Sequence, residues 1–167
     1  TMVRPFASAP MSPSIDRETD TPARRQRWLS LLAKAPPGRL EALWSGIGQV
    51  PGYAMLRRPE IGLVMVKGRI SGSGAPFCAG EMTVTRAAVR LQSGQIGIGY
   101  VGGRKPRQAE IVAAIDALGH LPEWHDTIET RIVTPLAVEA EARRRRVAAK
   151  AAATKVDFFT VAREAGS

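Results

Sequence analysis

Hydrophobic and polar residues alternate most regularly in the middle of the chain, between Gly62 and Gly103. Residues 63–68 follow the period of two that is typical of a β-strand, and the glycine-serine run at 71–74 then interrupts them. A second strand is predicted to start near Phe77, and a third, Ile96 to Val101, follows a short serine-glycine turn. The pattern therefore predicts an antiparallel meander that the rest of the chain covers.

The second predicted strand changes its apolar side near Arg86. Thr83 and Thr85 are polar odd-numbered positions, whereas Val89 and Leu91 are apolar ones. A β-bulge produces such a change by inserting one unpaired residue, and bulges often re-aim side chains beside functional sites. A short helical turn after Thr85 and a strand face packed against a partner are the two other interpretations.

Two helices are predicted before the strands. Thr21-Pro22 favours a helix start, and Pro36-Pro37-Gly38 favours its end. A second short helix follows, and the two should form a hairpin that lies over the sheet. Their apolar positions are Trp28, Leu31, Leu32, Ala35, Leu40, Leu43, Trp44 and Ile47. We interpret the two tryptophans as core residues, and exposed stacking platforms for bases are the alternative.

The rest of the chain is predicted to add two strands and two helices. The strands are an edge strand at Tyr53 to Arg57 and a last strand within Trp124 to Val133. The helices are Arg107 to Leu118 and Leu136 to Ala153. Because the last helix has only a thin apolar stripe, it should project or lie on another subunit.

These elements predict an α+β fold: an antiparallel β-meander of about four to five strands covered by helices, with an N-terminal helical hairpin and a projecting C-terminal helix. Residues 1–20 contain three prolines and no periodicity, so we expect a disordered or partner-bound lead-in. The α+β core then spans residues 21–134. Residues 135–167 hold the C-terminal helix and a Phe158-Phe159 anchor for subunit contacts.

A chain of 167 residues with 44% hydrophobic residues fits one folded domain. Its single cysteine, Cys78, excludes an internal disulfide and a multi-cysteine zinc site, and we interpret it as a small apolar filler. Two histidines are too few to propose a metal site. No apolar run approaches the roughly 20 residues that span a bilayer. Because a secretion-signal pattern is also absent, we expect a cytoplasmic protein.

The net charge of +9 is compatible with nucleic acid, an acidic membrane surface, phosphorylated metabolites or an acidic protein as partner. The arginine block at 143–146 supplies a dense part of that charge. The junction Gly102 to Pro106 offers a helix start with Arg104 beside it, and such positions attract anions. Ordinary capping also explains this junction, and the spacing of a Walker loop is absent.

Several ordered segments resemble the PhnG family of the bacterial carbon-phosphorus lyase system. They are the run 77–91, the pattern Gly99-Tyr100-x-x-Gly103-Arg104, the helix segment 109–118 and the ending 156–163. The similarity covers about residues 22 to 164 in the family's order. One departure is Lys105, because the family often has an acidic residue there.

The resemblance implies a subunit that joins PhnH, PhnI and PhnJ in a core complex of phosphonate metabolism, with a second copy of each. Together with PhnI, PhnH and PhnL it would support transfer of the ribose 5-triphosphate of ATP to an alkylphosphonate, with release of adenine. This is the transferase reaction of an alpha-D-ribose 1-methylphosphonate 5-triphosphate synthase. ATP, with a divalent metal ion, is the substrate of the complex, and no cofactor is expected on this chain alone. In the family, carbon-phosphorus cleavage belongs to PhnJ, and one cysteine cannot hold an iron-sulfur cluster.

Five polar residues are candidates for phosphate or substrate binding: Glu81, Thr85, Arg86, Arg90 and Arg104. Arginine binds phosphate oxygens in a bidentate manner, and a nearby carboxylate could orient the metal ion of a triphosphate. Ion pairs across a subunit interface are the other interpretation of these residues. No catalytic residue and no metal site is assigned. The candidates for subunit contacts are Arg143, Arg146, Asp157, Phe158 and Phe159.

Asp116 stands among apolar residues of a predicted helix, and we expect it to pair with a nearby arginine. A basic nucleic-acid-binding module is the alternative function, supported by the net charge and the arginine block. No helix-turn-helix, zinc-finger or RNP motif accompanies that charge.

Overall fold

Three strands form one antiparallel sheet in the order β1-β2-β3. β1 (Tyr53–Arg69) and β2 (Pro76–Leu91) are joined through a 3-10 turn (Ile70–Gly72), and β3 (Ile96–Gly102) follows β2. The computed structural model describes residues 20–153, and within this range the sheet has three strands. The α+β class is confirmed, but the predicted number of four to five strands is wrong.

One cause of the wrong count is that β1 runs through two segments that we predicted as separate strands. Its register against β2 shifts between Met55 and Arg57 and again between Arg57 and Glu60. Pro59 stands at the second shift, and its missing N–H suits a position where the ladder is interrupted. The irregularity that we predicted near Arg86 therefore lies opposite that residue, in β1. β2 itself pairs with β3 without a register shift.

The other cause is the predicted strand within Trp124 to Val133, which is helical. A 3-10 turn (Pro122–Trp124), α4 (His125–Ile128), a π-helical turn (Glu129–Val133) and α5 (Thr134–Ala153) follow one another directly. Thr134-Pro135 thus continues a helical stretch and does not start it. Ile128, Ile132 and Leu136 are buried at spacings of four, as on one face of a helix.

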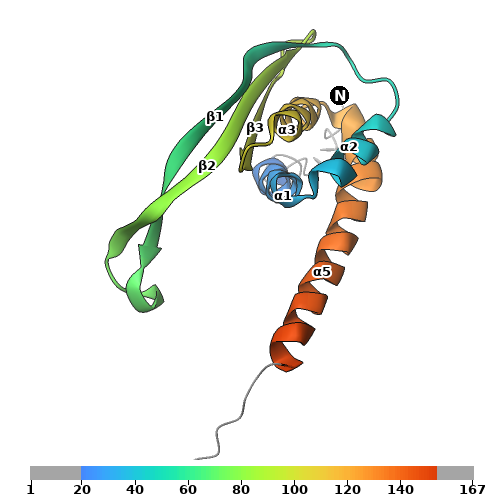
Figure 1. Ribbon diagram of the computed structural model, residues 1–167. Coiled ribbons are helices and arrows are strands. Elements are labelled where there is room, and N and C mark those ends of the chain that lie inside the picture. Colours follow the sequence, from blue (N-terminus) through green and yellow to red (C-terminus); the bar gives the residue numbers. More distant parts are fainter. Residues whose placement is uncertain (1–19, 154–167) are drawn as a thin grey trace, which may run out of the picture.

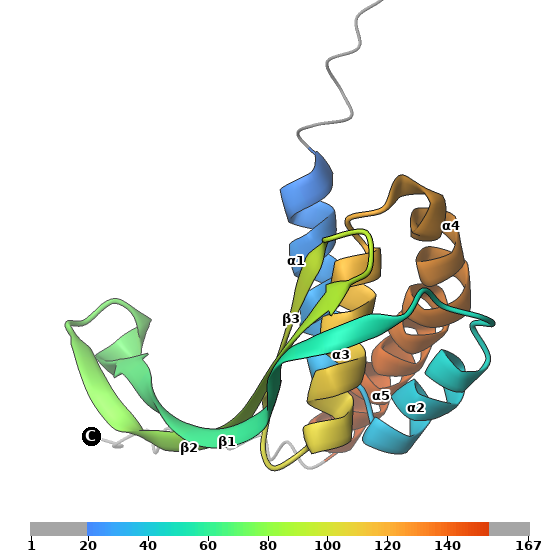
Figure 2. The same cartoon turned by 90° about the horizontal axis from the view of Figure 1, so that it is seen from above.

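The predicted N-terminal helices and the helix after the sheet are confirmed as α1 (Asp20–Lys34), α2 (Pro37–Ser45) and α3 (Pro106–Leu118). Residues 111–118 of α3 are all buried, so this helix forms the centre of the core. Trp28 and Trp44 are buried in the same core, as predicted. Figures 1 and 2 show these helices on one side of the sheet, and no described helix covers the other side, which we call the outer face.

Two glycines allow α3 to lie directly on β3. Side chains alternate along a strand, and Gly97 and Gly99 occupy the buried side of β3. A Cβ atom added at Gly97 would overlap the carbonyl oxygen of Ala113, and one at Gly99 would overlap that of Ala109. The helix backbone therefore approaches the strand at a distance that no larger residue permits.

β1 and β2 continue beyond β3 as a two-stranded hairpin arm, residues 63–83. β3 pairs with β2 only from Val84 to Arg90, so the arm has no third strand. Figure 1 shows the arm leaving the helices. Its exposed large apolar residues are Leu63, Met65, Val66, Ile70, Phe77 and Met82. A lone hairpin is marginally stable in water, so the arm would gain stability from a partner that covers it.

Candidate subunit-contact surfaces

The outer face of the sheet carries two of the five predicted phosphate-binding residues, Arg86 and Arg90. Arg86 lies opposite Tyr100 of β3, and Arg90 lies opposite Ile96. Residues four apart share a strand face at a separation of about 13 Å. Tyr100 and Ile96 are exposed. The outer face is therefore an open surface on which arginine and apolar side chains alternate.

The guanidinium of Arg86 is only partly satisfied by the fold. Its Nη2 lies 3.7 Å from Glu60 Oε1, and Arg57 Nη1 lies 3.5 Å from the other carboxylate oxygen. The Nε of Arg86 is buried and has no hydrogen-bond acceptor among the described residues. The exposed part of the guanidinium can bind an anion or a carbonyl group of a partner, whereas the buried Nε lies out of a partner's reach.

Glu81 does not join the arginines of the outer face. It is exposed on the arm, opposite Met65, and it lies five residues before Arg86 in a stretch without a register shift. Because side chains alternate along a strand, Glu81 and Arg86 point to opposite faces. Glu81 and Arg86 of one chain therefore do not form a carboxylate-guanidinium pair that could bind a single triphosphate.

The turn between β3 and α3 contains Arg104 and is contacted by Thr85 of β2. Thr85 is fully buried; its Oγ1 donates to the Gly103 carbonyl oxygen at 2.6 Å and accepts from the Lys105 N–H at 3.0 Å. The hydroxyl thus holds the turn and does not face solvent. Arg104 is exposed in that turn. The five predicted binding residues are consequently distributed over the arm, the outer face, the core and a loop.

The four arginines at 143–146 point to different sides of α5. Arg144 and Arg145 both pair with Glu141, at 2.8 Å and 3.1 Å, whereas Arg143 and Arg146 have no ion pair among residues 20–153. Arg143 and Arg144 line a groove beside α1, while Arg145 and Arg146 line a hollow on another face. This division differs from the single basic stripe of a nucleic-acid-binding helix. The other contact candidates, Asp157, Phe158 and Phe159, lie outside the described residues.

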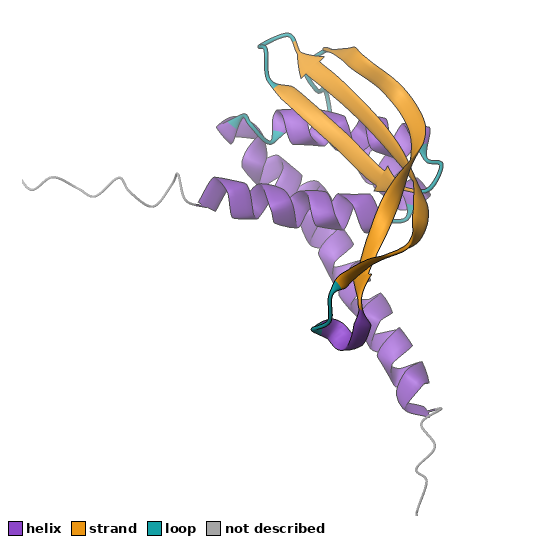
Figure 3. Ribbon diagram, turned by 90° about the vertical axis from the view of Figure 1, so that its left-hand side faces the viewer, coloured by secondary structure: helices purple, strands orange, loops and turns teal. Residues whose placement is uncertain are grey.

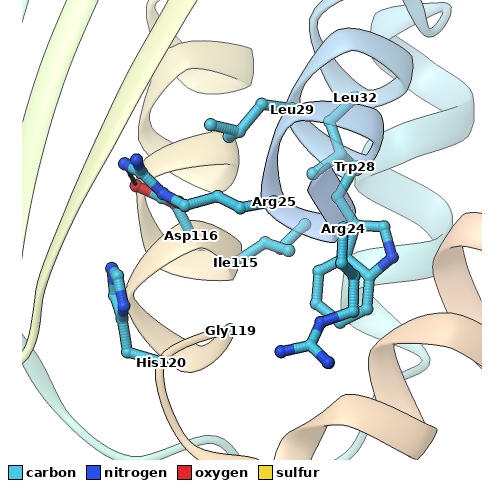
Figure 4. A pocket seen from close by; sticks show the side chains of 9 residues that line it. All are labelled: Arg24, Arg25, Trp28, Leu29, Leu32, Ile115, Asp116, Gly119 and His120. Carbon is cyan, nitrogen blue, oxygen red and sulfur yellow. Dashed lines mark hydrogen bonds and ion pairs between the residues drawn. The ribbon is translucent and has the colours of Figure 1, made fainter. Parts of the chain in front are cut away.

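Asp116 lies beside a small cavity between α1 and α3, and its predicted pairing with an arginine is confirmed (Figure 4). Arg25 donates to the two carboxylate oxygens from Nε at 2.7 Å and from Nη2 at 2.9 Å, and the Ile98 N–H donates at 2.8 Å. The hydrogen bond to Asp116 raises the pKa of Arg25. The cavity measures about 20 Å³, which is room for about one water molecule. Asp116 therefore links structural elements and does not line a substrate pocket.

Glu129 and His125 connect α1 to the C-terminal helical stretch, and the sequence pattern pointed to neither. Glu129 accepts from Trp28 Nε1 at 2.6 Å and from both terminal nitrogens of Arg27. His125 Nε2 lies 2.9 Å from the Gly119 carbonyl oxygen, and its ring meets Trp28 edge-on. The four-residue spacing of His125 and Glu129 would have indicated a shared helix face, but the segment was predicted as a strand.

Cys78 is exposed on the arm, with its Sγ 3.5 Å from Met65 Sδ, so its predicted role as an apolar filler is wrong. Within residues 20–153, no three metal-binding side chains gather at one place. No helix in the same range has the length and apolarity needed to cross a membrane.

Comparison with known proteins identifies the family of this chain. Residues 23–164 match the family model described as phosphonate metabolism protein PhnG. A protein of Rhizobium meliloti (strain 1021), named alpha-D-ribose 1-methylphosphonate 5-triphosphate synthase subunit PhnG, is 42% identical over 141 residues, which cover 84% of this chain and 90% of the relative. The family-model match includes the hairpin arm, the outer face and α5. The chain belongs to the PhnG family of phosphonate metabolism proteins.

Proposed function

We propose that this chain is a subunit of the carbon-phosphorus lyase core complex. In that assembly it supports transfer of the ribose 5-triphosphate of ATP to an alkylphosphonate, with release of adenine. Membership of the PhnG family and the synthase-subunit name of the Rhizobium relative support this assignment. ATP, with a divalent metal ion, is a substrate of the assembly. The partners are PhnH, PhnI, PhnJ and a second copy of the chain, and PhnL joins for the activating step.

The observation that carries the proposal is the apolar surface that this fold leaves uncovered. Leu63 and Met65 on the arm are 64% and 66% exposed, and Tyr100 and Ile98 are exposed on the outer face. Large contiguous apolar patches on a soluble protein mark interaction sites. Leu63 and Met65 lie opposite Thr83 and Glu81, on the strand face opposite to that of Arg86, so partners would have to contact both faces of these strands.

A supporting role, in place of catalysis by this chain alone, is favoured by the positions of the candidate residues. Glu81 and Arg86 point to opposite faces, and Thr85 is buried. Arg86 and Arg90, in contrast, present cations on an open face. Arginine forms bidentate hydrogen bonds with carboxylates and with phosphates, so these two residues suit contact with a neighbouring subunit or with a triphosphate held by it.

Reconstitution tests this function. The full chain, PhnH, PhnI and PhnL are mixed with ATP and methylphosphonate, and adenine is measured by liquid chromatography. Adenine release should require the chain and fall to background when it is omitted. Undiminished release without the chain would contradict the supporting role, and release by the chain alone would contradict its dependence on partners.

An Arg86→Ala variant separates assembly from substrate contact. We expect the complex to form less completely and adenine release to fall in proportion, because the groups of a neighbouring subunit that contact Arg86 would lose their cationic partner. Size-exclusion chromatography gives the first quantity and the adenine assay gives the second. Arg131→Ala, at an exposed arginine of the π-helical turn, is the control. Full assembly with loss of adenine release would instead assign Arg86 to the substrate.

A further inference from the structure

A groove of about 700 Å³ lies between α1 and α5. Its floor is made of small and aliphatic residues: Leu31, Ala35, Val133, Leu136, Ala140, Val147, Ala148 and Ala151. Figure 1 shows that α5 continues well past α1. Val147, in the C-terminal half of α5, is 63% exposed. From Val133 to Ala151 the groove follows about 27 Å of helix at 1.5 Å per residue.

The floor on α5 forms a helical stripe with a cation on each side. Leu136, Ala140, Val147 and Ala151 fall within an arc of about 60°, since each residue turns an α-helix by about 100°. On the same scale Arg143 and Arg144 fall on opposite edges of the stripe. Lys34 and Arg27, which pairs with Glu129, add two cations from α1, and no acidic residue lines the groove in the described part of the chain.

Three of these cations are available for a partner. Arg143 has no hydrogen bond or ion pair among residues 20–153, and Arg144, although it pairs with Glu141 at 2.8 Å, keeps 76% of its side chain exposed to a partner. The Lys34 ammonium contacts only Ser30 Oγ, at 3.3 Å, among the described residues. An apolar stripe between two basic edges is complementary to an amphipathic helix whose apolar ridge is flanked by aspartate and glutamate.

Charge also argues against two other occupants. A second copy packed along the same stripe would bring Arg143 and Arg144 of both chains together, and like charges at an interface are costly. Nucleic acid would neutralise the arginines but would leave Val147 and the alanines without apolar cover. An amphipathic helix with acidic flanks would cover the apolar stripe and pair with the cations at its edges.

We propose that the groove between α1 and α5 binds an acidic amphipathic helix of another protein chain. The aliphatic ridge of that helix rests on the stripe from Leu136 to Ala151, and its carboxylates pair with Arg143, Arg144 and Lys34. The alanines of the stripe allow the two helix backbones to approach closely. The proposal rests on the proposed function only in taking the donor of this helix from the same complex.

Photo-cross-linking in the complex tests the occupant. A photoreactive amino acid replaces Val147 in the full chain, which is co-expressed with PhnH, PhnI and PhnJ, and mass spectrometry locates the cross-link. We expect it in a helical segment of a partner that carries aspartate or glutamate beside aliphatic residues. A cross-link to residues 154–167 of the same chain, to a second copy or to nucleic acid would overturn the proposal.

Two double variants test the charged edges. Arg143→Glu/Arg144→Glu changes the groove, and Arg145→Glu/Arg146→Glu is a matched control on another face. Each variant reverses two charges and removes one of the two ion pairs to Glu141. The probe is a synthetic helical peptide with a leucine ridge flanked by glutamate, and its binding to the full chain is followed by fluorescence anisotropy. The first variant should weaken binding about tenfold or more, and the control less than about twofold.

The two experiments separate failure of the groove proposal from failure of the proposed function. If no complex forms but the peptide distinguishes the two variants, the proposed function fails and the groove proposal stands. If the complex forms but both variants bind the peptide alike, the groove proposal fails and the proposed function stands. A lysine-flanked peptide that binds as well as the glutamate-flanked one would also overturn the groove proposal.

Discussion

The Asp116 carboxylate joins three elements of the fold. It accepts two hydrogen bonds from Arg25 of α1 and one from the Ile98 N–H of β3, and only 1% of its side chain is exposed. A buried carboxylate is costly unless its oxygens are paired, and here all three donors come from other elements. The side chain therefore fixes α1 and α3 against the free edge of the sheet.

Replacing Asp116 by alanine should lower the free energy of unfolding by about 2–3 kcal/mol, because charge-assisted hydrogen bonds are lost and the Ile98 N–H is left without an acceptor. Asp116→Asn should cost less, since the amide oxygen can still accept from Ile98. Urea unfolding followed by tryptophan fluorescence measures both values. Equal losses for the two variants would show that the hydrogen bond from the Ile98 N–H contributes nothing.

Tyr53 provides a second test at a single residue. Burial raises the pKa of its phenol, and the hydrogen bond to Glu110 Oε1 at 2.9 Å raises it further. A folded-state pKa above the unfolded value of about 10 means that the associated stability is complete below pH 10 and is lost as the pH rises through the folded pKa. The chain has two tyrosines, so a Tyr100→Phe variant reports Tyr53 alone through its phenolate absorbance. The midpoint should exceed about 10 and should fall when Glu110→Gln is added; an ordinary midpoint would contradict the burial of Tyr53.

At the scale of elements, the contact between α3 and β3 depends on the absence of two side chains. Gly99→Ala should destabilise the fold by about 3 kcal/mol or more, because its Cβ would overlap the carbonyl oxygen of Ala109 and a packed backbone cannot move aside. Gly102→Ala, in the same strand, meets no atom within 4 Å and is the matched control. Thermal unfolding monitored by circular dichroism compares the two variants. A Gly99→Ala protein as stable as Gly102→Ala would contradict the close approach.

The hydrophobic pattern predicted the elements best where it extended over many residues. The meander and the helices around Trp28, Trp44 and Ile115 were recognisable, because more than two turns or strand repeats select one period. The short run around Ile128 and Ile132 fits both periods, and only its burial against the helices selected the helix. The continuity of β1 past Pro59 could not be predicted locally, since proline usually ends a strand.

The candidate site was harder to predict than the elements. Strand alternation alone already placed Glu81 and Arg86 on opposite faces once the irregularity was located in β1 and not in β2. The Thr85 hydroxyl bonds to Gly103 and Lys105, which lie 18 and 20 residues later in the sequence, so the local pattern could not indicate its burial. The groove beside α5 needs two helices that are distant in sequence, so no single segment could indicate it.

At the scale of the whole molecule, the uncovered surfaces lie at one end and on one face. Figures 1 and 3 show the hairpin arm and α5 leaving the body at the same end, and Figure 2 shows the outer face turned away from the helices. Within the described residues, no third strand pairs with either edge of the arm, and such edge strands readily pair with another chain. Binding energy in an assembly would therefore be shared among the arm, the outer face and the groove, and each can be tested separately.

The arm offers the sharpest of these tests, because Leu63 on the arm and Val138 on α5 are almost equally exposed, at 64% and 66%. Aspartate at either position should change the stability of the chain alone by less than about 1 kcal/mol, as for most surface substitutions. In co-expression with PhnH, PhnI and PhnJ, Leu63→Asp should weaken assembly about tenfold or more, because a charge is then buried where an apolar side chain was covered. Val138→Asp lies outside the groove and should assemble normally. If Leu63→Asp assembled like the unaltered chain, the arm would have to remain in solvent in the complex, and its apolar residues would need another explanation.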